Sequence, residues 1–165
     1  MNRNILEMRG ITKSFPGVRA LDKVDFSCIS GEVHALVGEN GAGKSTLMKI
    51  LAGAYRQDEG EIRVKGKEMN ISSPRDAQRH GISIIYQEFN LIPDLNVAQN
   101  VFLGREPKRR GFIDTASIHQ RTEALLSDLG VKIDPYAKAK NLSVAEQQMV
   151  EVAKALSVNA DMIIM

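Results

Sequence analysis

This 165-residue chain has little of several features that would place it in common classes of protein. Its one cysteine, Cys28, excludes an internal disulfide framework and is typical of a reducing compartment. The 22 basic residues nearly balance the 20 acidic ones, so the net charge of +2 gives no indication of a nucleic-acid partner. No apolar run approaches the roughly 18–20 residues that cross a bilayer, and the N-terminus has no apolar core of signal-peptide length. We therefore expect a soluble chain, or one held at a membrane only through a partner.

The pattern of apolar residues predicts a mixed α/β core followed by a mainly helical segment. Hydrophobic residues make up 43% of the chain, which is enough for a buried core in one domain of this length. No internal repeat or low-complexity segment interrupts the pattern. The predicted strands cover residues 5–11, 24–29, 33–37, 61–64, 82–86 and 162–165, and the predicted helices cover 45–51, 74–80, 96–103, 116–129 and 143–156.

A glycine-rich stretch near the start carries the strongest chemical signal. It fits the spacing G-x-x-x-x-G-K-[ST], in which glycines let the backbone curl so that successive N–H groups point at phosphate oxygens. Lys44 is expected to reach the β- and γ-phosphates, and the Ser45 hydroxyl to join the coordination of a Mg²⁺ ion. The residues of this cradle are Gly38, Glu39, Asn40, Gly41, Ala42, Gly43, Lys44, Ser45 and Thr46.

The surroundings of the stretch support a phosphate cradle over a glycine-rich turn of no function. Residues 33–37 predict a buried strand before the loop, and residues 45–51 predict a helix after it. The positive N-terminal end of such a helix favours an anion.

Two further motifs follow along the chain. Gln87 ends the predicted strand 82–86, and the sequence LSVAEQQ, from Leu142, opens a helix that Ser143 would cap with Glu146 as its partner. Alone, the second motif is equally typical of an amphipathic helix with a good cap. The order of cradle, glutamine and LSxxxQQ helix resembles the ATP-binding cassette ATPases over the whole chain. Three stretches are similar in sequence to the simple-sugar importers of the ribose and galactose type: GENGAGKSTLM, IIYQE and LSVAEQQMVEVAKAL.

This resemblance implies a P-loop NTPase core with a mixed sheet plus an inserted α-helical subdomain, and ATP with Mg²⁺ as cofactors. It places Phe15 where an aromatic ring stacks on adenine, although a core phenylalanine in a turn is the alternative. It places Gln87 at the metal or at the attacking water, although a polar strand end is the alternative. Ser143 would contact the γ-phosphate of a nucleotide held by a second cassette. Val144 and Ala145 stand where the commonest signature has glycines, which makes backbone contact with phosphate there less certain than contact through Ser143.

The resemblance also indicates what lies outside this sequence. Residues 161–165 begin a buried strand and then stop, so we expect the chain to be the N-terminal part of the first of two cassettes. The aspartate and glutamate that follow this strand in the family, and the later switch histidine, are not among these residues. We therefore expect hydrolysis by this stretch alone to fail largely, because a missing general base costs on the order of 10²–10⁴ in rate.

The resulting hypothesis is an ATPase subunit of a sugar importer at the cytoplasmic face of a bacterial membrane. Its expected parts are an ATP-binding core (1–95), a helical subdomain (96–157) and the start of a core strand (158–165). Its expected partners are transmembrane permease subunits, a sugar-binding protein acting indirectly and a second cassette, with no nucleic acid. The alternatives are a cassette ATPase that transports nothing, a P-loop kinase or GTPase, and a truncated remnant without function.

Two other features of the sequence give weaker indications of function. The stretch 105–110 is basic and could face anionic lipid or a membrane subunit, but a solvated loop is the favoured interpretation. Cys28 is expected to be a small buried hydrophobe and not a nucleophile.

Overall fold

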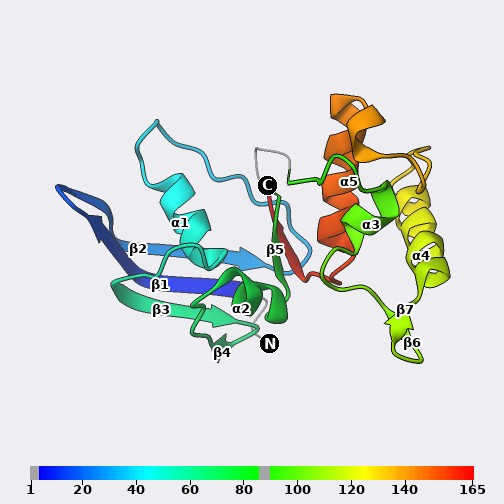
Figure 1. Cartoon of the computed structure of the whole chain (residues 1–165). Coiled ribbons are helices and arrows are strands. Elements are labelled where there is room, and N and C mark those ends of the chain that lie inside the picture. Colours follow the sequence, from blue (N-terminus) through cyan, green and yellow to red (C-terminus); the bar gives the residue numbers. More distant parts are fainter. Residues whose placement is uncertain (1–3, 86–89) are drawn as a thin grey trace. The chain divides into compact units, whose positions relative to one another are not determined.

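The structure is a computed structural model that describes residues 4–85 and 90–165. The chain divides into two compact units, Met1–Ile82 and Ser83–Met165 (Figure 1). The proposed functional division at residues 95 and 157 stays a prediction. Among the described residues, no helix combines the length and the apolar character that a membrane span requires.

The first unit is built on an antiparallel sheet of four strands. Strand β1 (Asn4–Phe15) pairs with β2 (Val18–Ile29) through a turn at Pro16 and Gly17, and also pairs with β3 (Glu59–Val64) on its other edge. The short strand β4 (Lys67–Glu68) completes the order β2-β1-β3-β4. The strands predicted at 5–11, 24–29 and 61–64 are therefore confirmed, and all three extend further than their apolar patterns indicated.

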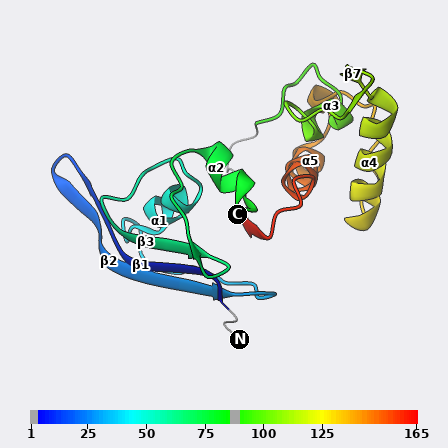
Figure 2. The ribbon, with the colours of Figure 1, turned by 90° about the horizontal axis from the view of Figure 1, so that it is seen from below.

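One face of this sheet forms the core of the first unit. Leu6, Met8 and Ile62 are fully or almost fully buried, and each contributes about 1.5–3 kcal/mol by leaving water. Helix α1 (Lys44–Leu51) buries Leu47, Ile50 and Leu51 and lies beside the sheet in both views (Figures 1 and 2). Helix α2 (Pro74–Arg79) begins with proline after the cap Ser73, whose side chain accepts a hydrogen bond from the N–H of Asp76. Both helices confirm their sequence predictions.

The second unit is mainly helical. Helices α3 (Val97–Val101), α4 (Thr115–Asp128) and α5 (Val144–Leu156) pack on one another (Figure 2). A short 3₁₀ helix, Ala139–Asn141, precedes α5. The shared core consists of apolar residues from all three helices and the loops between them: Val97, Ala98, Val101, Phe102, Ile118, Leu126, Ile133, Val150 and Ala153.

Caps begin these helices where the sequence predicts them. Asn96 forms a capping box with Gln99, and Ser143 forms one with Glu146. The prediction that α3 continues to residue 103 is wrong, because Phe102 already has a non-helical backbone and the chain turns at Gly104 with a φ of 74°.

Two short strands, β5 (Ile82–Ile84) and β8 (Met162–Ile164), form a separate two-stranded sheet. The N–H of Ile85 donates to the carbonyl of Ile164 at 2.8 Å. These strands confirm the predictions at 82–86 and 162–165 over the residues they cover, and residues 86–89 lie outside the described part of the chain.

The buried strand predicted at 33–37 is wrong. These residues form no strand, and Val33 and Val37 are 99% and 87% exposed. A parallel-sheet strand is stabilised by hydrogen bonds to its neighbours and by cover on both faces, and the segment pairs with none of the strands that the structure describes. The apolar pattern alone is therefore not sufficient to form the strand.

The sequence pattern predicts no strand between residues 96 and 155, but the structure has two there. Strands β6 (Lys108–Arg109) and β7 (Phe112–Ile113) form a small hairpin. Its two turn residues, Arg110 and Gly111, have φ values of 53° and 87°, as a type I′ turn requires. Residues 108–110 of the stretch predicted as a solvated loop thus belong to a hairpin, and Phe112, next to its turn, is 80% exposed.

Candidate functional site

The glycine-rich stretch 38–46 lies at the N-terminus of helix α1. Gly43 is the N-cap residue and has left-handed backbone angles, with φ 83° and ψ −2°, while Gly41 has a φ of 88°. The helix begins directly after Gly43, because the N–H of Leu47 donates to the carbonyl of Gly43 at 2.9 Å. Two left-handed residues within three positions produce the curl that the sequence predicts, and both are glycines because L side chains disfavour this conformation.

Gly43 is also fixed by close packing. A Cβ atom at this position would lie 2.5 Å from the carbonyl oxygen of Ala20 and 2.7 Å from Cδ2 of Leu21. Both neighbours belong to strand β2, so the start of the helix rests directly on the sheet. Gly41 differs, since a Cβ atom there would meet nothing within 4 Å.

The first turn of α1 offers donors for an anion. Gly43 has no side chain, and no side chain caps the helix. The first turn also contains no acidic residue. The N–H groups at the start of a helix have no partner within the helix, and together they favour a phosphate or another anion.

The Lys44 side chain folds back over the loop. Its Nζ donates to the carbonyls of Gly38 at 2.6 Å and Glu39 at 2.7 Å. The loop is closed further by a hydrogen bond from the N–H of Ala42 to the carbonyl of Glu39 at 3.2 Å. The ammonium group therefore lies at the mouth of the curl, beside the N–H groups that could hold phosphate oxygens.

Phe15 lies at the end of strand β1 and is half-buried. Its ring packs edge-on against Tyr55, with a centroid distance of 5.3 Å, and Nζ of Lys13 lies 5.6 Å from its centroid. Sequence reasoning missed Tyr55, because a tyrosine after a helix carries no motif. The ring of Phe15 is therefore supported by neighbours that fix its orientation.

Asp58 fixes the end of β1 that carries Phe15. Its carboxylate accepts from Nζ of Lys13 and from the N–H of Ser14, both at 2.7 Å. These bonds, with the lysine contributing most, hold the pKa of Asp58 below its ordinary value. Sequence reasoning missed this residue as well, since the bonds join positions 44 and 45 residues apart.

Gln87 lies outside the described residues. The chain that follows it is held by helix α5 of the same unit. Glu151 accepts from the N–H of Asn90 at 2.8 Å, and Nζ of Lys154 donates to the carbonyl of Asn90 at 3.2 Å. The segment just after the predicted metal-binding glutamine is thus tied to the helix that Ser143 opens.

Ser143 is exposed and caps α5. Its hydroxyl donates to the carboxylate of Glu146 at 2.7 Å and accepts from the N–H of Glu146 at 3.3 Å. The N–H of Ser143 donates to the same carboxylate at 2.8 Å. The hydroxyl and this N–H hold the pKa of Glu146 below its ordinary value. Val144, at 66% exposure, leaves the first turn of α5 open to solvent.

Comparison with known proteins shows which family the chain is similar to. Residues 21–165 match the family model of the ABC transporter. The chain is 57% identical over 163 residues to the ribose import ATP-binding protein RbsA 1 of Rubrobacter xylanophilus, covering 99% of this chain and 33% of that protein. It is 56% identical over 162 residues to a putative ribose/galactose/methyl galactoside import ATP-binding protein 2 of Agrobacterium fabrum, covering 98% and 32%. The chain thus spans about a third of the length of these relatives.

Solved structures show the same fold. The ADP conformation of MJ1267, an ATP-binding cassette of an ABC transporter, matches with a TM-score of 0.83 at 27% identity, over 97% of this chain and 67% of that one. A nucleotide-free cassette from an ABC transporter matches with a TM-score of 0.80 at 27% identity, over the same shares. These matches confirm the predicted fold class. The chain belongs to the ABC transporter family.

Proposed function

We propose that residues 38–46 hold the phosphates of ATP and that the chain is the nucleotide-binding part of a sugar-importer ATPase. The observation that carries this proposal is the curl at Gly41 and Gly43, which opens an uncapped helix N-terminus toward an anion. The names of the similar relatives, which are import ATP-binding proteins for ribose and galactose, supply the substrate class.

Within this site, Lys44 and the loop N–H groups bind the phosphates. Nζ of Lys44 would exchange the carbonyls of Gly38 and Glu39 for phosphate oxygens, which attract a cation more strongly. The fit is favourable because the first turn of α1 has no carboxylate to repel a triphosphate. Phe15 would stack on the base.

Ser45 and Gln87 would hold a Mg²⁺ ion, which neutralises phosphate charge when it is bound. The Ser45 position fits this role, since a hydroxyl at the second residue of α1 lies next to Lys44 in the chain and is exposed. Ser143 would contact the nucleotide of a second cassette, and its hydroxyl would then release the Glu146 carboxylate that it now binds.

The partners follow from the import role. We propose transmembrane permease subunits, an indirectly acting sugar-binding protein and a second cassette, with the protein peripheral at the cytoplasmic face of the membrane. A cassette ATPase that transports nothing would co-purify with ribosomes or DNA, whereas the import role predicts co-purification with a multi-spanning membrane subunit.

Equilibrium binding of ATP to a Lys44→Ala variant tests the site. Loss of a charged hydrogen bond costs about 1.5–3 kcal/mol, so we expect Kd to rise roughly 10- to 150-fold. Lys67→Ala is the matched control, because Lys67 carries the same charge and is exposed on β4, at the opposite edge of the sheet from strand β2, which contacts the start of α1. Equal Kd values for the two variants would contradict the proposal.

A further inference from the structure

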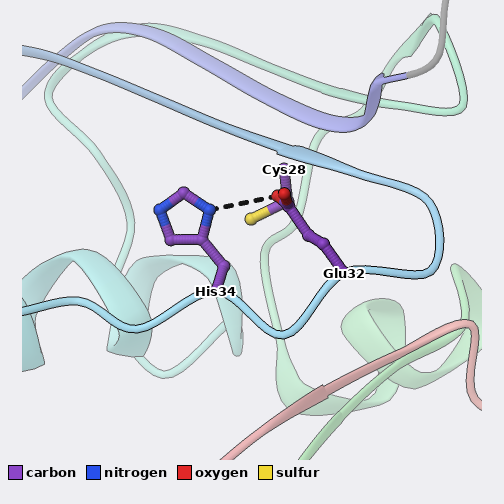
Figure 3. A group of neighbouring side chains, drawn as sticks. All are labelled: Cys28, Glu32 and His34. Atoms are coloured by element: carbon purple, nitrogen blue, oxygen red, sulfur yellow. Dashed lines mark hydrogen bonds and ion pairs between the residues drawn. The ribbon is translucent and has the colours of Figure 1, made fainter.

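Three different metal-binding side chains meet at the end of strand β2, in the chain that leads to the phosphate cradle. Cys28 is the second-last residue of β2, Glu32 lies in the turn that follows and His34 lies two residues further on. One thiol sulfur, one carboxylate oxygen and one ring nitrogen from these residues all lie within 4.8 Å of one another. Figure 3 shows the three side chains converging from the strand and from the loop that runs back beside it.

Local contacts hold the three donor groups in place. Gly31, with a φ of 81°, reverses the chain, and the N–H of Ile29 donates to Oε1 of Glu32 at 2.8 Å. The same oxygen lies 3.1 Å from Nδ1 of His34 (Figure 3). The ring of Phe26 packs edge-on against the imidazole at a centroid distance of 5.0 Å. The imidazole therefore has contacts on its nitrogen side and against its ring, and it faces the carboxylate.

The donor set indicates which ion would fit. A thiolate and an imidazole favour Zn²⁺ over Mg²⁺ and Ca²⁺, which prefer oxygen ligands. Zn²⁺ bonds of about 2.0–2.3 Å in tetrahedral geometry place neighbouring ligand atoms roughly 3.3–3.6 Å apart. The donor atoms lie within 4.8 Å of one another, so the widest separation would have to shorten by at most about 1.5 Å. A small rotation of side chains can provide this, since Glu32 and His34 are both exposed.

We propose that Cys28, Glu32 and His34 bind one Zn²⁺ ion, with water in the fourth position. The thiolate and the carboxylate together balance the charge of the ion. Binding would join the end of β2 to His34 in the exposed segment 33–37, four residues before Gly38. It would therefore restrain the chain that enters the phosphate cradle, and it does not depend on nucleotide binding.

Titration of the reduced full chain with Co²⁺, a spectroscopic substitute for Zn²⁺, tests the proposal. We expect one equivalent per chain, with a sulfur-to-cobalt charge-transfer absorption that Zn²⁺ abolishes and excess Mg²⁺ leaves unchanged. Because Cys28 is the one cysteine in the sequence, that absorption reports this residue. Half an equivalent per chain would indicate an ion shared by the cysteines of two chains and would overturn the proposal.

Substitutions identify the other ligands. Cys28→Ser should remove the charge-transfer absorption, and both Cys28→Ser and His34→Gln should weaken binding by more than about tenfold, since even loss of a group that only orients a ligand costs 10–100-fold. His80→Gln, at the end of α2, is the matched control, and circular dichroism checks that each variant is folded. If His34→Gln binds Co²⁺ as tightly as His80→Gln does, the site is not the one proposed.

Discussion

Replacing Gly43 by alanine tests how the phosphate cradle is built. The new methyl group would lie 2.5 Å from the carbonyl oxygen of Ala20 and 2.7 Å from Cδ2 of Leu21. Contact with a backbone carbonyl is not relieved by rotation of a side chain, so α1 or β2 must shift. The alanine would also keep a φ of 83°.

The magnitude follows from three contributions. A left-handed alanine costs about 1–2 kcal/mol, and overpacking of this kind costs about 1–3 kcal/mol. Alanine also lowers the conformational entropy of the unfolded chain, which offsets about 0.4–1 kcal/mol of this cost. Gly43→Ala should therefore lower the free energy of unfolding of the first unit by about 1–5 kcal/mol. Gly41→Ala has the backbone strain without the overpacking, because its Cβ meets nothing within 4 Å. Its cost in unfolding free energy is therefore about 0–1.5 kcal/mol.

Native-state hydrogen exchange of the α1 and β2 amides is the suitable assay, because it reports the stability of the first unit separately from that of the second. Gly43→Ala should speed exchange in α1 more than Gly41→Ala does, and should also weaken ATP binding. Equal exchange in the two variants would refute the close approach of the helix start to β2.

Two further predictions concern other parts of the fold. Asn100 is fully buried, accepts from the N–H of Ile92 at 2.7 Å and donates to three backbone carbonyls. Asn100→Ala should therefore cost about 2–4 kcal/mol in denaturant unfolding of the second unit, and a cost no larger than that of exposed Asn141→Ala would contradict it. Asp58 has a lowered pKa through Lys13, so its stabilisation is complete above the unfolded pKa of about 3.9 and is lost as pH falls through the lower folded pKa. Asp58→Asn should consequently lower the thermal midpoint at neutral pH more than at about pH 3, and an equal loss at both would contradict the ion pair.

Local signals made the helices predictable from the sequence. Ser73 with Pro74, and Ser143 with Glu146, act within one turn of the chain, and the structure confirms each start. The curl at 38–46 was predictable for the same reason, since the glycines themselves permit the left-handed angles that it needs.

Features that depend on distant parts of the chain were not predictable. The apolar residues 33–37 indicated a buried strand, but an apolar pattern does not supply the neighbouring strands that a buried strand needs. The hairpin at 108–113 depends on left-handed Arg110, which has no strong sequence signal. Cys28 was expected to be a buried hydrophobe, but it is half-buried beside Glu32 and His34, because the turn at Gly31 brings together residues that no motif connects.

Hydrogen exchange of the unsubstituted chain with and without Mg²⁺–ATP tests the central claim most directly. If the N–H groups of the cradle bind the phosphates, ATP should slow exchange of the amides of residues 41–46. Adenosine at the same concentration should not. Binding of ATP that leaves these amides unprotected would contradict the claim.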